Sequence, residues 1–588
     1  MIKIKIMKTI HNHKRWRKAI YLLALLPASF FSSCSDQMNY NEYYVYDKDY
    51  MTQVFGRAEG FLTTAYNELD YDFGQSMSGA MLASATDESE YAYTGNTVEG
   101  FFNGSWSASN SHSGVWTSAF NGIRYANLFL DEFSNLSFDN LKYNDDYEAQ
   151  KFNYQNMKYE ARFLRAYFYL NLVRQYGGAP IISSNIPAEE VNRLSRNTSD
   201  EVFNFIDSEC DEIKDSIVKD YTNLGEYALS YTPTGRANQL AVLALKARAA
   251  LYHASPLFNA DNNKELWHKA ALACKELIDA SESQGKKLCN KYMSLWSSTN
   301  FTDAQPFGEI LFIRCVGEDN KWEKYNFPTG LEGAKGGNCP TQDLVDAYEM
   351  QATGLSIHEN GSGYDATNPY IGRDPRFEMT ICHNETTNWP NWATEPIYTY
   401  QGGANGLPLY GGTPTGYYLK KLLNAAVDTR AASYNKLKHN WIIFRLGEAY
   451  LNYAEAVFKY LGSADATSAE FPMSAREAAS KTRTTREDVK MPAFPVGLSN
   501  DAFWEKYKNE RRIELAFEGH RFWDVRRWKE ADKYFSKITE MHITKNDDGS
   551  YTYTPKTVAR RWEDKMYLFP IPQSELLKDK NLTQNPGW

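Results

Sequence analysis

The sequence has 588 residues and a mass of 67.4 kDa, which is enough for several domains around a large apolar core. Its 64 basic and 73 acidic residues give a formal net charge of −9, which argues against nucleic acid as a partner, because phosphate binding needs a basic surface. Hydrophobic residues make up 43% and charged residues 23%, so the chain is not of the disordered class. The 41 Tyr and 14 Trp residues suit binding surfaces that are half apolar and half hydrated.

The first 33 residues have the composition of an export signal. They carry seven basic side chains and no acidic one, and an apolar run covers residues 19–31. This run is too short to span a bilayer as a helix, but it matches the apolar region of a signal peptide. Small residues stand directly before Cys34, and the segment resembles a bacterial lipoprotein signal. The resemblance implies cleavage after residue 33 and a lipid on Cys34; a plain secretory signal with an incidental cysteine is the alternative.

Removal of the signal would take the formal net charge from −9 to −16, because seven positive charges leave with it. Residues 34–54 are rich in Tyr, Asn and Asp and lack helical periodicity, so we expect a lipidated tether there. No apolar run of about 18 residues follows Cys34, and the lipid is therefore the expected membrane anchor. Six further cysteines show no metal-ligand spacing, so no metal ligand can be named.

A period of 3.6 residues dominates the rest of the chain and predicts a mainly α-helical fold. Apolar residues recur with this period in three segments, residues 163–173, 240–251 and 446–457. Gly177 and Pro256 follow the first two segments as helix stops. Further helical segments are expected from near Glu201, Trp267 and Ala475, and over residues 55–69 and 116–133. The segments mix small and aromatic residues, which predicts about four stacked pairs of helices similar to tetratricopeptide repeats.

Residues 286–440 are less regular and are dense in Gly, Pro, Asn, Trp and Tyr. Only short strands are expected in them, such as residues 309–316. Near the end of the chain, residues 541–544 and 551–554 flank Asp548-Gly549, which predicts a β-hairpin. Irregular segments of this kind carry binding sites more often than helices do.

Residues 509–528 read NERRIELAFEGHRFWDVRRW and combine alternating charges with large apolar anchors. On one continuous helix, Glu510, Glu514 and Glu518 would share a face, Glu518 would reach Arg521, and His520 would reach Asp524. The segment is therefore expected to be a helix held by partly buried ion pairs. An acid/base pair is the catalytic alternative, because ion-pair networks and active sites both gather carboxylates.

This segment, together with LFPIPQSE at residues 568–575 and NLTQNPGW at residues 581–588, resembles the closing signature of the SusD/RagB family. Supporting similarity covers residues 116–127, 163–180 and 445–456. The resemblance implies a SusD-like fold in which helix pairs support an irregular, loop-rich part with a few short strands. It also implies a nutrient-binding lipoprotein at the bacterial outer membrane and a partner, a SusC-like TonB-dependent transporter. The resulting division is signal peptide 1–33, tether 34–54, helical region 55–285 and loop-rich region 286–588.

The chain carries no recognisable catalytic or nucleotide-binding motif, and no cofactor is expected. Asn259-x-Asp261-x-Asn263 begins like a calcium loop, but Lys264 stands where the loop needs glycine. A glycosidase needs two carboxylates at a set separation, and the sequence selects no such pair. We therefore expect a binding protein rather than an enzyme.

A sugar ring presents C–H groups on its faces and hydroxyls at its edge, so its site requires aromatic rings with polar neighbours. Rings of this kind occur in loops beside Asp, Asn and Lys, and the expected glycan contacts are Asp87, Trp106, Trp322, Tyr325, Trp389 and Trp392. For each ring, burial against the helices is the alternative. The expected ligand is an oligosaccharide or polysaccharide; peptide capture and glycan hydrolysis are the alternatives.

Overall fold

The computed structural model describes residues 48–112 and 114–588 of the chain. The predicted signal peptide, Cys34 and most of the predicted tether lie outside these residues. The end of the tether prediction is corrected, because α1 (Lys48–Met51) falls within it and Met51 is fully buried. No helix of the described residues is both long and apolar enough to cross a membrane.

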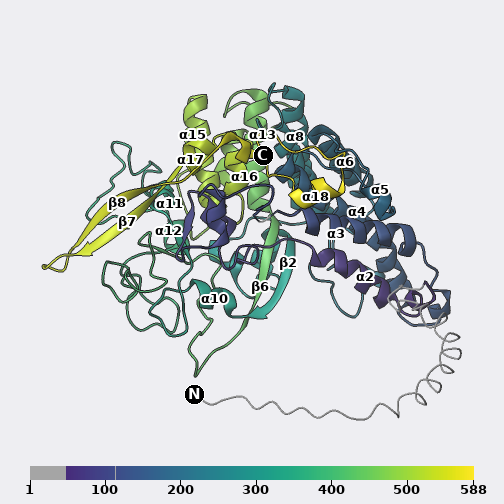
Figure 1. Cartoon of the computed structure of the whole chain (residues 1–588), viewed down its shortest axis with the longest axis horizontal. Helices are drawn as coiled ribbons and strands as arrows, with labels where there is room; N and C mark the ends of the chain where they lie inside the picture. The colour runs from purple at the N-terminus through teal and green to yellow at the C-terminus, as the bar shows by residue number, and fades with distance from the viewer. Residues whose placement is uncertain (1–47, 113) are drawn as a thin grey trace, which may run out of the picture.

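Eight helices form an array in which each packs on the next along the chain, and they curve across the upper and right-hand parts of Figure 1. They are α2 (Phe55–Asn67), α3 (Trp116–Leu128), α4 (Tyr147–Tyr176), α6 (Ser199–Ile213), α7 (Gln239–Ala254), α8 (Lys264–Ser283), α13 (Leu446–Leu461) and α14 (Ala475–Thr484). The mainly α-helical prediction and the expected helix pairs are confirmed.

Local sequence signals set the ends of these helices. Capping boxes start α6, through Thr198 and Glu201, and α14, through Ser474 and Glu477. Gly177 ends α4 at φ 82°, a backbone angle that favours glycine. Close packing uses glycine as well: a Cβ on Gly122 of α3 would lie 2.2 Å from the Phe168 ring of α4.

Further helices, most of them short, are distributed over the loop-rich part and the connections. They are α5 (Ala188–Val191), α9 (Ala304–Glu309), α10 (Lys321–Asn326), α11 (Gln342–Ala347), α12 (Arg376–Thr380), α15 (Asn500–Glu514), α16 (Arg521–Arg527), α17 (Ala531–Phe535) and α18 (Gln573–Lys578).

The strands of the described residues form two-stranded antiparallel sheets, in the pairs β1–β3, β2–β6, β4–β5 and β7–β8. The strands are β1 (Ser89–Tyr91), β2 (Ile310–Asp319), β3 (Asn338–Pro340), β4 (Ile381–Cys382), β5 (Tyr418–Leu419), β6 (Leu437–Arg445), β7 (Lys537–Lys545) and β8 (Tyr551–Ala559). The predicted strand at residues 309–316 is β2, and the predicted hairpin is β7–β8, which projects to the left in Figure 1.

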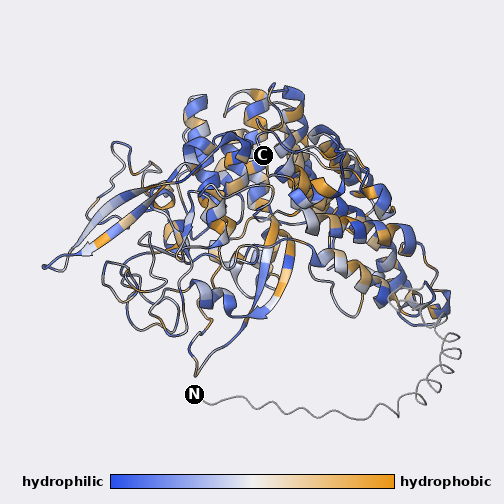
Figure 2. Ribbon diagram, in the orientation of Figure 1, coloured by the Kyte–Doolittle hydropathy of each residue, from blue (hydrophilic) through white to orange (hydrophobic). Residues whose placement is uncertain are grey.

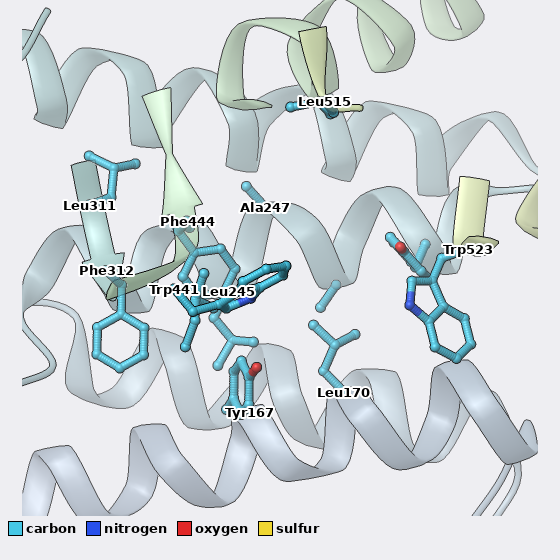
Figure 3. Close-up of a cluster of buried hydrophobic side chains, with 14 of the residues drawn as sticks. Tyr167, Leu170, Leu245, Ala247, Leu311, Phe312, Trp441, Phe444, Leu515 and Trp523 are labelled. Carbon is cyan, nitrogen blue, oxygen red and sulfur yellow. The ribbon is translucent and has the colours of Figure 1, made fainter. Parts of the chain in front are cut away.

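One apolar core joins the helix array to the loop-rich part. Phe312 of β2 contacts Phe163 of α4, with ring centroids 5.1 Å apart, and Phe444 of β6 lies against Tyr167 of α4 at 6.4 Å. Figure 2 shows the hydrophobic colour concentrated along β2 and β6, and Figure 3 shows these side chains meeting those of α4 and α7. The two predicted regions therefore share buried surface.

The expectation of one continuous helix over residues 509–528 is wrong. Helix α15 ends at Glu514, the chain turns through Phe517 (φ 61°) and Gly519 (φ 80°), and α16 begins at Arg521. The turn takes Glu518 out of helical register with Glu514 and with Arg521. The cations that pair with Glu518, Arg445 and Lys421, come from distant segments.

The acidic residues of this segment lie in a fully buried ion-pair network rather than in partly buried pairs. The carboxylate of Glu514 accepts hydrogen bonds from three guanidinium groups, those of Arg376 at 2.9 Å, Arg445 at 2.8 Å and Arg486 at 2.8 Å. Burial alone would raise the pKa of Glu514, but the three cations lower it to about 2. Its contribution to stability is therefore present above its ordinary pKa of 4.5 and is lost as the pH falls through 2.

Other members of the network extend it to neighbouring elements. Glu518 pairs with Arg445 at 2.7 Å and with Lys421 at 2.8 Å, whereas Arg521 pairs with Asp87 at 2.8 Å. A Cβ on Gly447 would lie 2.3 Å from the Arg445 guanidinium, so this glycine lets α13 start against the network. These carboxylates are matched by buried cations, an arrangement that serves packing, and it does not support the acid/base alternative.

Replacing Glu514 by Gln should reduce the free energy of unfolding by about 3–5 kcal/mol, because three buried guanidinium groups would lose their shared anion. Urea denaturation followed by circular dichroism measures this change. Glu505→Gln, at a side chain that is 59% exposed, is the control and should stay within about 0.5 kcal/mol of the parent. Equal effects of the two substitutions would contradict the assignment.

Candidate functional site

A groove of about 420 Å³ lies in the loop-rich part, within the volume range of small-ligand sites. It lies between the loop of residues 73–79, the end of β2, helix α10 and His439 of β6. Figure 1 shows α10 beside β2 and β6, at the lower edge of the molecule. The polar side chains on its wall are Gln75, Ser78, Asp319, Lys321 and His439.

Helix α10 is fixed to the protein by its inner face. The indole of Trp322 donates a hydrogen bond to the Leu422 carbonyl at 3.1 Å. The side-chain oxygen of Asn326 accepts a hydrogen bond from the backbone amide of Asn338 at 3.1 Å. Trp322, Glu323 and Asn326 are buried. This anchoring leaves Lys321 and Tyr325, four residues apart, on one face of the helix toward the groove.

Four neighbouring tyrosines form what we call the tyrosine cluster: Tyr91, Tyr93, Tyr325 and Tyr410, of which Tyr325 lines the groove. The Tyr93 ring lies 5.7 Å from Tyr91 and 5.0 Å from Tyr410, between centroids. Tyr410 is 87% exposed and Tyr325 is 41% exposed, and the Lys335 ammonium lies 4.6 Å from the Tyr325 ring. The rings of Tyr325 and Tyr410 offer hydrated aromatic faces outside the apolar core.

Backbone geometry links the tyrosine cluster to the groove. Gly79, on the groove wall, has φ 103°, and a Cβ there would lie 2.3 Å from the Tyr91 hydroxyl oxygen. Burial and the neighbouring phenol groups raise the pKa of Tyr91 to about 12. Its hydroxyl therefore keeps its proton at neutral pH and remains a hydrogen-bond donor.

A buried ion pair fixes α10 under the groove. The Glu323 carboxylate lies 2.8 Å from Nε2 of His439 and accepts a hydrogen bond from the Asn424 amide at 3.0 Å. Burial alone would lower the pKa of His439, but Glu323, and more weakly Asp319, raise it above 6.5. The other carboxylate oxygen of Glu323 has no hydrogen-bond partner within the described residues, so the imidazolium provides most of its compensation.

The structure brings two of the predicted contacts to this groove. Tyr325 presents an exposed ring there, whereas Trp322 lines the groove but is only 5% exposed and serves mainly as an anchor. Trp392 is half-buried elsewhere, with its indole donating to the Val427 carbonyl and the Arg430 guanidinium 5.0 Å above its ring.

The other predicted contacts are buried, and we remove them from the candidate site. Trp106 is 3% exposed and lies among Phe101, Phe569 and Trp588. Trp389 is 7% exposed and packs against the Phe327 ring at 5.2 Å. Asp87 is 3% exposed, and its carboxylate is occupied by the guanidinium groups of Arg512 and Arg521. Burial of the ring or pairing of the charge leaves no surface for a ligand.

Sequence reasoning missed Tyr91, Tyr93 and Tyr410, and also His439 in the groove wall. Tyr93 and Tyr410 lie close to glycines, in Tyr93-Thr-Gly95 and Tyr410-Gly411. Such glycines indicate turns, which can expose a neighbouring ring, so the sequence held a signal for these two residues. Contacts between segments that are far apart in sequence bring these residues together. No group of three or more His, Cys, Asp or Glu side chains within the described residues is placed to hold a metal ion.

Two family models match separate parts of the chain. Residues 312–588 match the SusD family, and residues 47–251 match a family described as starch-binding and associating with the outer membrane. Over these two ranges the chain is similar to the SusD family. Among curated proteins, SusD-like protein P25 of Formosa agariphila is 24% identical and covers 79% of this chain and 77% of its own. SusD-like protein P2 of the same organism is 22% identical over 73% of each chain.

Solved structures of SusD-like proteins have the same fold. A SusD-like protein from Bacteroides fragilis superposes with a TM-score of 0.72 at 25% identity, covering 92% of this chain and 98% of its own. A SusD-like carbohydrate-binding protein from the same species gives 0.70 at 21% identity, covering 91% and 100%. A laminarin-binding SusD-like protein gives 0.60 at 20% identity, covering 91% and 99%.

The raised pKa of His439 predicts that α10 is held more firmly at low pH than at high pH. The pair with Glu323 stabilises the folded state below the ordinary His pKa of 6.5, and this contribution is lost as the pH rises through the higher folded value. Hydrogen exchange of residues 321–326, corrected for intrinsic rates, should therefore show less protection at pH 9 than at pH 6. His439→Gln should remove this pH dependence.

His358→Gln is the control, because the His358 side chain is 72% exposed and lies outside the groove. It should leave the pH dependence unchanged. If His439→Gln kept the parent's difference between pH 6 and pH 9, the ion pair would not be its cause.

Proposed function

We propose that this protein is an outer-membrane lipoprotein that binds an oligosaccharide or polysaccharide in the groove and delivers it to a SusC-like TonB-dependent transporter. The observation that carries this proposal is the exposed ring of Tyr325 on the wall of a cavity of about 420 Å³, with the exposed ring of Tyr410 in the adjoining tyrosine cluster. Matches to the starch-binding family description and to SusD-like carbohydrate-binding and laminarin-binding structures support it.

The chemistry of the groove suits a sugar chain. Tyr faces pack against the C–H face of a pyranose ring, and the groups at the ring edges then find partners in Gln75, Ser78 and Lys321. Gln75 and Ser78 donate and accept hydrogen bonds with hydroxyls, Lys321 donates them, and Asp319 adds an acceptor. An open groove of this kind supports fast release, which handover to a transporter requires.

The leader supports the proposed location. Seven basic residues, an apolar run and Cys34 match the pattern of a lipid-anchored exported protein. The family description, association with the outer membrane, agrees with it. We infer that the lipid on Cys34 holds the protein at the cell surface beside its transporter.

Binding without cleavage is the form of activity that the groove favours. Glycoside hydrolysis usually requires two carboxyl groups across the scissile bond. Within the described residues, Asp319 supplies the one carboxylate on the groove wall, and Glu323 behind it is fully buried and paired with His439. Incubation of the purified protein with polysaccharides should therefore release no new reducing ends.

Replacing both Tyr325 and Tyr410 by Ala should weaken glycan binding at least about tenfold, or about 1.4 kcal/mol, because the ligand loses two exposed rings. Affinity electrophoresis in gels containing laminarin, starch or other polysaccharides, followed by calorimetry with the polysaccharide retained, measures the loss. The melting temperature should stay near that of the parent, because both rings are partly or largely exposed.

The matched control replaces two exposed tyrosines of the helix array, Tyr143 and Tyr231, by Ala. It should retain the polysaccharide as the parent does. Equal loss in both double variants would remove the groove from the proposal, and retention of peptides instead of glycans by the parent would favour peptide capture.

Cys34→Ser should abolish lipid attachment and release the protein from the outer membrane. Metabolic labelling with a fatty acid, followed by membrane fractionation, measures this change. Cys315→Ser, at the one half-buried cysteine of the described residues, is the control and should stay labelled and membrane-bound. Membrane retention of the labelled Cys34→Ser protein would contradict the lipoprotein assignment.

A further inference from the structure

A second cavity, which we call the central pocket, lies where the helix array meets the loop-rich part. Its walls come from Asp70, Ser76, Arg174, Trp441 and Trp523, among others, and its volume is about 110 Å³. This space holds roughly seven water molecules, so it admits one sugar ring rather than a chain. Figure 3 shows Trp441 and Trp523 on the same side of α4, separated by the space above Tyr167 and Leu170.

The central pocket and the groove are neighbours, but no described residue lines both of them. Phe73 lies between them, with its ring 5.3 Å from Trp441 on one side and 5.4 Å from Trp322 on the other. The neighbouring residues Gln75 and Ser76 are both exposed, yet Gln75 lines the groove and Ser76 lines the central pocket. The side chain of Asp70, which is 41% exposed, and the exposed Ser76 lie on the wall of the central pocket and mark its opening.

Both cations on the wall of the central pocket are paired within the protein. Arg174 pairs with Asp70 at 3.2 Å and Arg248 with Glu448 at 2.6 Å, while Glu518 pairs with Lys421 and Arg445. Within the described residues, Asp72 is a carboxylate of this wall without a cationic partner. The described part of the wall therefore offers no free cation to an anionic ligand and fits an uncharged one.

Burial shifts the pKa of two titratable groups of the wall. Burial raises the pKa of Asp72 to about 6, while its carboxylate accepts a hydrogen bond from the Leu82 amide at 2.7 Å. Burial and the nearby Arg248 and Arg511 lower the pKa of His520 well below 6.5, so its ring is neutral at pH 7.

Polar groups without partners remain on the same wall. Nε of Arg174 is buried and lacks a hydrogen-bond partner within the described residues. The indole N–H groups of Trp441 and Trp523 and the side-chain amide nitrogen of Gln175 are not fully buried, and the described residues give them no hydrogen-bond partner. These donors face one cavity and are available to a ligand rich in acceptors.

We propose that the central pocket binds one neutral sugar unit, at a site separate from the groove. Indole and phenol walls face the apolar surface of the ring, and the unpaired donors reach its hydroxyl and ring oxygens. This proposal does not rest on glycan binding in the groove, because the two cavities use different residues.

Saturation-transfer difference NMR with glucose, galactose, mannose and xylose tests the proposal on full-length protein. The parent should show transfer to at least one of these sugars, and Ser76→Trp, which fills the opening, should reduce it to background. Gln75→Trp, one residue away on the groove side, should keep it. Trp441→Phe, which preserves an aromatic ring but removes the N–H donor, should weaken the transfer several-fold.

Retention of polysaccharide, measured on the same variants, separates this proposal from the proposed function. We expect Ser76→Trp to retain polysaccharide and Gln75→Trp to lose it. Absence of transfer from the parent protein to all four sugars, or transfer that survives in Ser76→Trp and disappears in Gln75→Trp, would overturn the central pocket as a sugar site, whatever the polysaccharide does.

Discussion

The anion of Glu514 holds together segments that are far apart in the chain. Arg376 of α12, Arg445 at the end of β6 and Arg486 after α14 all donate to this one carboxylate, which is fully buried. A buried carboxylate is costly unless it is fully paired, so the three cations and their elements must occupy fixed positions around it. Because β6 also carries Trp441 and His439, the network determines the position of both cavities.

The loop of residues 73–79 contributes residues to the walls of both cavities. It crosses between the helix array and the loop-rich part, where Phe73 packs against Trp322, His439 and Trp441. One short loop thereby forms a wall of the groove on one side and adjoins the central pocket on the other. The Phe73 ring separates the two cavities.

The abundance of aromatic residues has two physical uses in this protein. Rings such as Trp106 and Trp389 fill space against other rings, whereas Tyr325 and Tyr410 lie at the surface beside polar groups. Both uses follow from the amphipathic nature of these side chains. Composition indicates that such a protein can bind a sugar, but it does not distinguish a ring of the core from a ring of the site.

Features encoded by neighbouring residues could be predicted from the sequence. Helical periodicity and stop residues located α4, α7 and α13, and turn residues located the β7–β8 hairpin, because periodicity, caps and turns depend on residues a few positions apart. The tertiary structure alone decided the break after Glu514, the pairing of Asp87 with Arg521 and the gathering of Tyr93 with Tyr410. Exposure and ion pairing depend on which distant segments pack together, and one sequence carries no direct signal of those contacts.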